Sequence, residues 1–253
     1  MTTGLSYSGA VAGTTSYKTQ IATLSVVEED NAAFVAVLPQ MITYAENRIY
    51  RDLDFLFTSV ANTSYSINQS SRTISVPSSN FDGAGGTLVV SEQINLITPS
   101  GVTNPDLGTR VALLPTTKEF LDAVYGASAS TGRPKYFCPF DDYTFLVGPY
   151  SDATYRVEIV GTVRPASMSA SNQTTFISLN LPDLFIMASM VYVSAYQRNF
   201  SSSLANDPQM PVNYEMQYAA LLKSAMEEEA RKKYEAAGWS SQEPSQFATP
   251  TRG

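Results

Sequence analysis

The periodicity of the hydrophobic residues changes twice along the chain. These two changes limit the possible folds more than any other feature of the sequence does. Four apolar residues recur at four-residue steps and predict an amphipathic helix over about 38–53: Met41, Ala45, Ile49 and Leu53. From about residue 55 apolar and polar residues alternate as in short strands, and helical spacing returns after residue 180. The pattern predicts an α+β fold, with a helical bundle made by N- and C-terminal helices and an antiparallel β domain inserted between them.

This pattern divides the chain into five segments. The expected parts are an N-terminal arm and short helix at 1–37, the bundle at 38–54 and 180–238, a mainly antiparallel β domain with one short helix at 55–169, and an extended tail at 239–253. Residues 1–16 have the Ser, Thr and Gly content of a flexible arm, and 17–27 suits a short amphipathic helix. The arm shows neither the basic nor the apolar region of a secretory signal, so none is expected.

The first bundle helix is expected to begin near Pro39, because proline suits an early helical position. Its polar face carries Arg48 and Asp52 at a spacing that allows an ion pair. Glu46, Asn47 and Arg51 are expected to complete this polar surface.

The middle of the chain predicts a hairpin, a further strand and a helix. The runs 135–140 and 143–147 flank Asp141-Asp142, which suits a turn, and 155–163 alternates as a strand does. Residues 116–125 read as a helix, in which Thr116 with Glu119 resembles a capping box. The side chains expected to be buried on that helix are Phe120, Leu121 and Val124.

The two C-terminal helices differ in character. Residues 184–196 are apolar on nearly every side, which predicts burial all round, against the same domain or a neighbouring subunit. The run 184–197 is shorter than the roughly 20 residues that span a bilayer, so no membrane anchor is expected. A long helix is predicted over 212–237, ending at Gly238.

Side chains of two kinds are expected along this long helix. Its predicted apolar stripe consists of Tyr214, Tyr218, Leu221, Leu222, Ala225 and Met226. Its second half is expected to stand in water, with three i,i+4 ion pairs: Glu227–Arg231, Glu228–Lys232 and Glu229–Lys233.

The composition excludes several kinds of protein. The chain has no histidine, which removes the usual general base near neutral pH and the Ser-His-Asp and Cys-His arrangements. A net charge of −7 argues against wrapping of nucleic acid, because such binding needs a basic surface. The single cysteine, Cys138, has no disulfide partner and is expected to be a small buried residue.

No pattern in the chain qualifies as a catalytic, metal or cofactor site, and none of these is expected. Glu28-Glu29-Asp30 lacks the ligand spacing of a calcium loop and suits a solvated helix start. The glycines of 83–86 are followed by neither a helix nor a lysine, so they indicate a loop. The 15 tyrosines and 12 phenylalanines fit a core and protein interfaces, and a sugar-binding surface stays open.

The order and the sequences of several segments resemble one family, the head-to-tail connector adaptor proteins of short-tailed and related tailed bacteriophages. Five segments carry the resemblance in family order: LPQMITYAENRIYRDLD at 38–54, STGRPKYF at 130–137, FLVGPYSDATYRVEIVGTVRPASMS at 145–169, NLPDLFIMASMVYVSAY at 180–196 and NYEMQYAALLKSAMEEEARKKY at 213–234. TGRP before an aromatic strand and the LPDL entry to a helix are the most specific of these motifs.

The resemblance implies a structural virion protein at the head–tail junction, made in the host bacterial cytoplasm and without catalysis. It implies a ring of about twelve copies under the portal protein, which docks tail nozzle or fibre proteins and leaves a channel for DNA. Such a ring would carry about 12 × (−7) = −84 charges, which suits DNA that slides without sequence-specific binding.

Large aromatic side chains concentrate interface energy, so they are the first candidates for contacts. Candidates for the portal interface are Tyr234, Trp239, Phe247 and Arg252. Candidates for the subunit interface are Phe185, Met187, Tyr192, Tyr196, Tyr214 and Tyr218. For Trp239, packing on the end of its own helix is an equal alternative.

Two other classes of function stay open. A receptor- or glycan-binding tail module would use exposed aromatics and loops of the β domain. A cell-wall hydrolase would need two carboxylates about 5–10 Å apart in a cleft, and no such pair can be nominated from spacing.

Overall fold

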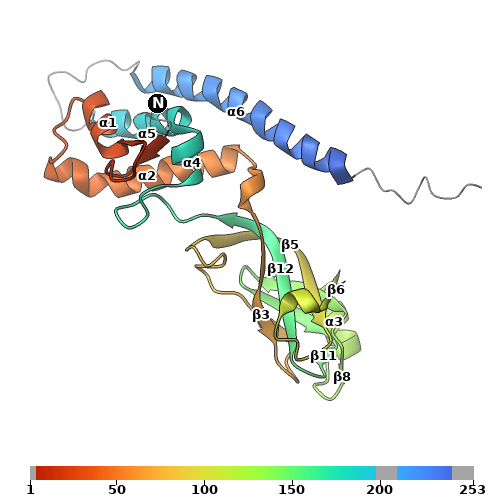
Figure 1. The fold of residues 1–253 in the computed structure, drawn as a ribbon. Coiled ribbons are helices and arrows are strands. Elements are labelled where there is room, and N and C mark those ends of the chain that lie inside the picture. Colours follow the sequence, from red (N-terminus) through yellow and green to blue (C-terminus); the bar gives the residue numbers. More distant parts are fainter. Residues whose placement is uncertain (1–3, 198–209, 241–253) are drawn as a thin grey trace, which may run out of the picture. The chain divides into compact units, whose positions relative to one another are not determined.

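The structure is a computed structural model that describes residues 4–197 and 210–240. Two compact units share the chain (Figure 1): Met1–Leu56 with Ser167–Gly253 form the helical unit, and Phe57–Ala166 form the β unit. Helices and antiparallel sheets are both present, as predicted. The arrangement of a bundle with an inserted β domain stays a prediction.

The helical unit contains two short strands and five of the helices seen in the described residues. Its elements are β1 Gly4–Ser6, β2 Thr14–Ser16, α1 Tyr17–Leu24, α2 Ala32–Asp52, α4 Phe176–Asn180, α5 Pro182–Gln197 and α6 Met210–Ser240. The short helix predicted after the arm corresponds to α1, which Ser16 caps by accepting a hydrogen bond from the amide of Thr19. The predicted long helix corresponds to α6, which continues two residues beyond Gly238.

The start of α2 differs from the prediction. The helix begins at Ala32, because the side-chain oxygen of Asn31 accepts hydrogen bonds from the amides of Ala33 at 3.0 Å and Phe34 at 3.2 Å. Pro39 therefore lies inside the helix, and a start near Pro39 was wrong. The acidic run 28–30 does stand just before a helix start, as expected.

Residues 4–16 differ from the expected flexible arm. β1 and β2 pair in parallel, and Leu5 and Ser6 are buried. The amide of Tyr7 donates to the carbonyl of Gln173 at 2.8 Å, which ties this segment to the chain just before α4. The burial of Leu5 and the pairing of β1 with β2 hold segment 4–16 in a defined position. The Ser, Thr and Gly content of this segment does not indicate such order.

α5 lies between α2 and α6 in the helical unit (Figure 1). The ring of Phe185 stacks on Tyr17 of α1 at 4.8 Å between centroids, and the Tyr17 hydroxyl donates to Ser189 at 2.7 Å. The apolar character of α5 is thus explained by burial within its own unit, which was one of the two alternatives. In the described parts of the chain, no helix is both long and apolar enough to cross a membrane.

The β unit contains two four-stranded sheets. Its elements, after the 3-10 turn η1 Leu56–Thr58, are β3 Ser59–Ile67, β4 Thr73–Ser75, β5 Thr87–Thr98, η2 Pro105–Leu107, β6 Thr109–Ala112, β7 Leu114–Pro115, α3 Lys118–Tyr125, β8 Thr131–Gly132, β9 Tyr136–Asp141, β10 Thr144–Gly148, β11 Tyr150–Ser151 and β12 Tyr155–Arg164. The strand orders are β3-β12-β5-β6 and β4-β10-β9-β7, and β8 pairs with β11. Most pairs are antiparallel, whereas β7–β9 and β8–β11 are parallel.

The predicted strand at 155–163 is the central strand β12, with a core on one side. Val157 and Ile159 of β12 and Ile94 and Leu96 of β5 are fully buried and pack in one cluster. The predicted hairpin is also confirmed: β9 and β10 pair around Asp141-Asp142, and the Asp141 carboxylate accepts from the amide of Tyr143 at 2.8 Å. Cys138 is buried in β9, as expected.

The short helix α3 differs from its prediction in its cap and its buried face. Thr117, not Thr116, caps it by accepting from the amide of Phe120 at 3.3 Å. Leu121 alone is fully buried, whereas Phe120 and Val124 are exposed. The helix spans only about two turns, so few of its positions can face the sheet, and Leu121 is the one that is buried.

Candidate assembly surfaces

Polar side chains join α2 to the first half of α6. Nη1 of Arg48 donates to Oε2 of Glu215 at 2.8 Å, and Nη2 donates to the other carboxylate oxygen. The guanidinium also lies over the ring of Tyr218, 4.2 Å from its centroid, and the Tyr218 hydroxyl donates to Asp52 at 2.7 Å. The expected pair between Arg48 and Asp52 is present at 3.6 Å. These four side chains form the α2–α6 contact.

Two side chains of the α2–α6 contact have shifted pKa values. The bond from Arg48 holds the pKa of Glu215 below its ordinary value. Burial, together with the bond to the Asp52 carboxylate, raises the pKa of the Tyr218 hydroxyl. The contact therefore keeps Glu215 charged and Tyr218 neutral near neutral pH.

The second half of α6 is also held by ion pairs, although only one of the three expected pairs is formed. Lys232 pairs with Glu228 at 2.8 Å, as predicted, and with Glu229 at 2.7 Å. Lys233 pairs instead with Asp54, beyond the end of α2, and Arg231 donates to the backbone carbonyl of Glu227. The buried Glu229 also accepts from the amide of Leu56 at 3.4 Å. One face of this half of α6 therefore packs against its own unit.

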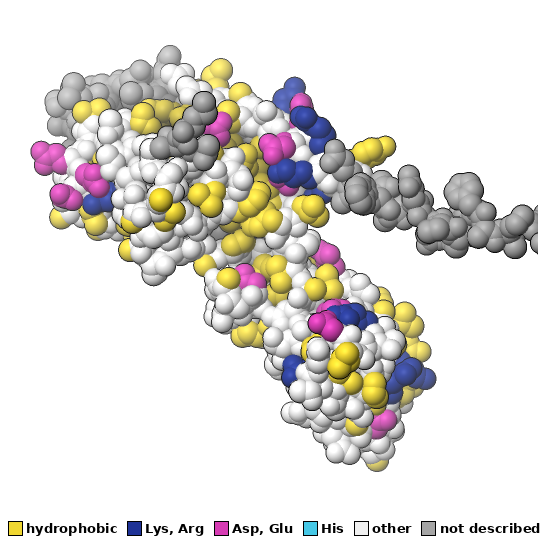
Figure 2. Space-filling view, in the orientation of Figure 1, with side chains coloured by type: hydrophobic (Ala, Val, Ile, Leu, Met, Phe, Trp, Pro, Cys, Tyr) yellow, Lys and Arg dark blue, Asp and Glu magenta, His cyan; other side chains and the backbone are white. Residues whose placement is uncertain are grey.

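One side of the exposed surface of α6 is mostly apolar. Seven residues follow one another at steps of three or four and form the outer stripe: Val212, Met216, Ala219, Lys223, Met226, Ala230 and Tyr234. Met226 was predicted to lie in the same apolar stripe as Tyr218 and Ala225, but it is exposed and belongs to the outer stripe. Figure 2 shows hydrophobic side chains that stand out from α6 between charged ones.

The proposed interface residues fall into four groups. Phe185 and Tyr218 are buried in their own unit, so neither offers side-chain surface to a second subunit. Met187, Tyr192 and Tyr214 are half-buried, and the Tyr192 ring lies 5.7 Å from that of Tyr44. Tyr234 is 81% exposed. Phe247 and Arg252, and the side chains of Tyr196 and Trp239, lie outside the described residues.

A buried carboxylate joins α2 to the segment that follows the β unit. Glu46 is 1% exposed and accepts from the amide of Met168 at 3.2 Å and from the hydroxyl of Thr175 at 3.2 Å. Burial raises its pKa from 4.5 to about 7, and hydrogen bonds to Ser167, Met168 and Thr175 oppose this shift.

The sequence had assigned Glu46 to a polar surface, and that assignment was wrong. The signal that could have placed it is its spacing, four residues after Ile42 and three before Ile49, both of which are buried.

Three aromatic side chains, one exposed and two half-buried, contact one another on the β unit. Phe120 of α3 contacts Tyr136 of β9 edge to face, with 5.5 Å between centroids, and Tyr125 stacks on Tyr136 at 6.2 Å. Phe120 is exposed and the two tyrosines are half-buried. These three rings form the aromatic cluster of the β unit, which resembles surfaces that bind proteins or sugars.

A metal site, or a hollow that contains paired carboxylates, would indicate chemistry in the described residues. Within 4–197 and 210–240, His, Cys, Asp and Glu nowhere form a group of three that could hold a metal ion. An open hollow of about 330 Å³ is lined by Gly4, Leu5, Thr15, Gln20, Pro182, Asp183, Ile186 and Met187. Its lining contains one carboxylate, whereas glycoside hydrolysis uses two.

The comparison with known proteins identifies one family. The family model of the SU10 adaptor protein matches residues 15–243, which include nearly all of both units. No curated protein matches the chain. The length of the family match and its span across both units show that the chain belongs to the SU10 adaptor protein family, a family of structural head–tail adaptors of phages.

Proposed function

We propose that this protein forms a ring beneath the portal of a tailed phage, docks tail nozzle or fibre proteins, and leaves a channel through which DNA passes. The observation that carries the proposal is the family match over residues 15–243. The outer stripe of α6 supports it, because an exposed apolar stripe of this length is typical of a surface that another polypeptide covers.

In this proposal the C-terminal end of the chain binds the portal. Tyr234 supports this role because its ring is exposed on the last turns of α6, where a partner can reach it. Trp239, Phe247 and Arg252 follow it in the sequence and would supply two further aromatic anchors and a cation. The polar composition of 239–253 suits a segment that binds along a groove of a partner.

Neighbouring subunits would meet through side chains that their own unit leaves partly uncovered. Met187, Tyr192 and Tyr214 retain exposed surface and remain candidates, as does Tyr196. The acidic chain, at −7 per copy, gives a ring with little attraction for DNA phosphates, which would favour passage over binding.

Removal of residues 239–253 tests the portal contact. We expect the shortened chain to fold, because α6 is held to its unit by residues before 234, and to lose co-sedimentation with portal rings. The full chain with Trp239→Phe is the matched control and should still bind, because it keeps an aromatic ring. Unchanged co-sedimentation of the shortened chain would overturn the portal contact at the tail.

The aromatic cluster of the β unit favours a second candidate function, the binding of a host glycan. In that case, Phe120→Ala should abolish binding of the full chain to cell-surface polysaccharide, while Val124→Ala on the same helix should not. If neither the wild-type chain nor the variants bind, the cluster is better explained as a docking site for a tail protein.

A further inference from the structure

The connection between α1 and α2 contains a residue whose backbone conformation opposes its side chain. Val26 has a φ of 54°, in the left-handed region, which β-branched residues avoid. Its amide donates to the carbonyl of Thr23 at 3.2 Å, and the amide of Val27 donates to the carbonyl of Ala22 at 3.0 Å. This is the Schellman pattern at the C-terminus of a helix, in which glycine normally occupies the position of Val26.

The side chain of Val26 does not compensate for this strain within its own chain. It is 88% exposed, so it gains little from burial, and glycine would adopt the same turn without strain. An apolar side chain that is both strained and exposed stabilises neither the fold nor the solubility of a single copy. Such a residue points to a contact outside the chain.

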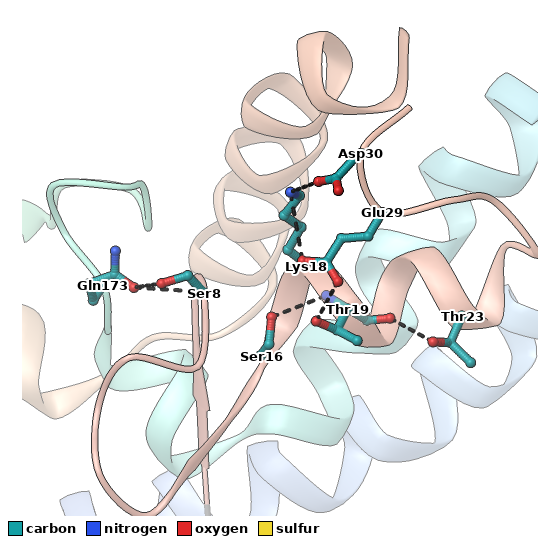
Figure 3. A network of polar contacts seen from close by, with 8 residues as sticks. All are labelled: Ser8, Ser16, Lys18, Thr19, Thr23, Glu29, Asp30 and Gln173. Atoms are coloured by element: carbon teal, nitrogen blue, oxygen red, sulfur yellow. Dashed lines mark hydrogen bonds and ion pairs between the residues drawn. The ribbon is translucent and has the colours of Figure 1, made fainter. Parts of the chain in front are cut away.

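The connection is held rigidly by a polar network (Figure 3). Lys18 of α1 pairs with Asp30 at 3.3 Å and with Glu29 at 3.6 Å, and the hydroxyl of Thr19 donates to Glu29 at 2.9 Å. These contacts tie α1 to the residues just before α2. Five exposed residues of this connection and of the adjoining helix ends form the corner: Leu24, Val26, Glu28, Asp30 and Val35.

The corner is apolar with an acidic edge. Three acidic residues, Glu28, Glu29 and Asp30, face one nearby base, Lys18, so the connection carries two net negative charges. The side chain of Asp30 is 99% exposed although it touches Lys18, so its charge stays available to a partner.

The outer stripe of α6 complements the corner, because it is apolar and carries a cation, whereas the corner is apolar and carries acidic residues. The residues of the stripe follow at steps of three or four, which is the spacing of a helix surface that packs against another polypeptide along its length. Lys223 is the fourth of its seven residues and its only charged member. If two outer stripes met antiparallel around their centres, two Lys223 ammonium groups would face each other, which disfavours a stripe-to-stripe pair.

We propose that the corner of one copy docks on the outer stripe of a second copy, with Val26 against Met226 and the acidic edge near Lys223. The two surfaces belong to different elements, so each copy can use both at once. Such a heterologous contact repeats from copy to copy and closes into a ring if its rotation permits. The inference rests on the proposed function, because it names the surfaces by which a ring would form.

Val26→Gly tests the corner with opposite effects on two measurements. We expect a melting temperature equal to that of wild type or up to ~4 °C higher, because the strain is removed. We also expect self-association at least roughly tenfold weaker by analytical ultracentrifugation, because a buried valine is lost at the interface. Leu107→Ala, which changes an exposed aliphatic residue of the β unit, is the control and should alter neither measurement.

A mixing experiment tests the pairing of the two surfaces. Val26→Asp and Met226→Asp should each leave the chain monomeric, whereas their mixture should give a 1:1 dimer and nothing larger, because one intact corner then meets one intact stripe. Lys223→Glu should weaken assembly, and Glu28→Lys in the same chain should restore it. Circular dichroism of each variant confirms that the helices are intact.

The outcomes separate this inference from the proposed function. If wild type assembles, alone or on portal rings, and Val26→Asp assembles equally well, the corner is not the contact and the ring function stands. If Met226→Asp alone abolishes assembly while Val26→Asp does not, stripes pair with another surface and the inference is overturned. If wild type stays monomeric even with portal rings, the ring function itself fails and the inference fails with it.

Discussion

Glu46 shows how a single side chain joins distant parts of the helical unit. It lies on α2, and its carboxylate accepts from Met168 and Thr175, more than a hundred residues later in the chain. Thr175 and Ser178 cap α4 reciprocally, so the buried carboxylate also helps to place the start of that helix. A buried acid that is held by neutral donors pays a desolvation cost when it ionises.

This cost predicts a pH dependence of stability. The folded pKa of Glu46, about 7, is raised above its ordinary value of 4.5, so the folded chain holds this proton more tightly than the unfolded chain does. Stability should therefore fall as the pH rises from about 4.5 to about 7, by up to ~3 kcal/mol from this residue.

Urea unfolding between about pH 5 and about pH 8 measures this dependence. In the Glu46→Gln variant the loss of stability over this range should shrink, because glutamine does not titrate. The exposed Glu227→Gln is the matched control and should behave as wild type does. An equal loss in the Glu46→Gln variant would mean that another group titrates.

At the scale of elements, the attachment of α6 to its unit decides which of its faces is free. Arg48, Asp52, Glu215 and Tyr218 hold its first half, and Asp54 with Lys233 holds its second. Because the inner face is occupied in this way, the outer stripe stays exposed. Loosening the α2–α6 contact should therefore affect the position of the stripe before it affects the β unit.

Tyr218→Phe tests the α2–α6 contact. The change removes the hydroxyl that donates to Asp52 and keeps the ring under Arg48, so we expect a loss of about 1–2 kcal/mol of stability. Hydrogen exchange should rise in the first half of α6 and stay unchanged in β12. Tyr234→Phe, at an exposed position of the same helix, should change neither quantity.

Local patterns predicted most elements, but not the contacts between them. The spacing of Tyr218 and Ala225 correctly indicated the buried face of α6, and the turn at Asp141-Asp142 was correct, because both signals lie within a few residues. Arg48 and Glu215 are 167 residues apart, so no periodicity connects them.

The same limit explains the sites that the sequence missed. The role of Val26 depends on a positive φ that a valine does not indicate, and the burial of Glu46 depends on a segment more than a hundred residues away. The φ of Val26 and the partners of Glu46 become visible only when the backbone is placed, although the spacing of Glu46 from Ile42 and Ile49 already indicated a buried position.

At the scale of the whole molecule, the division into two units has a structural basis at the ends of the β unit. β3 and β12 pair antiparallel, with Ser59 opposite Thr162, so the first and last strands of the unit are neighbours. The buried cluster around β5 and β12 is made by residues of the β unit alone. A unit with adjacent ends and its own core is expected to fold by itself.

We therefore predict that a fragment of residues 57–166 folds without the rest of the chain. Its near-ultraviolet circular dichroism should show ordered aromatic side chains, and urea unfolding should be a single cooperative transition. A fragment of residues 57–154 is the control and should not fold, because it lacks β12, the strand that lies between β3 and β5 in the sheet. A 57–166 fragment without cooperative unfolding would show that the β unit needs the helical unit for its stability, and the two could then not move or evolve as separate modules of the adaptor.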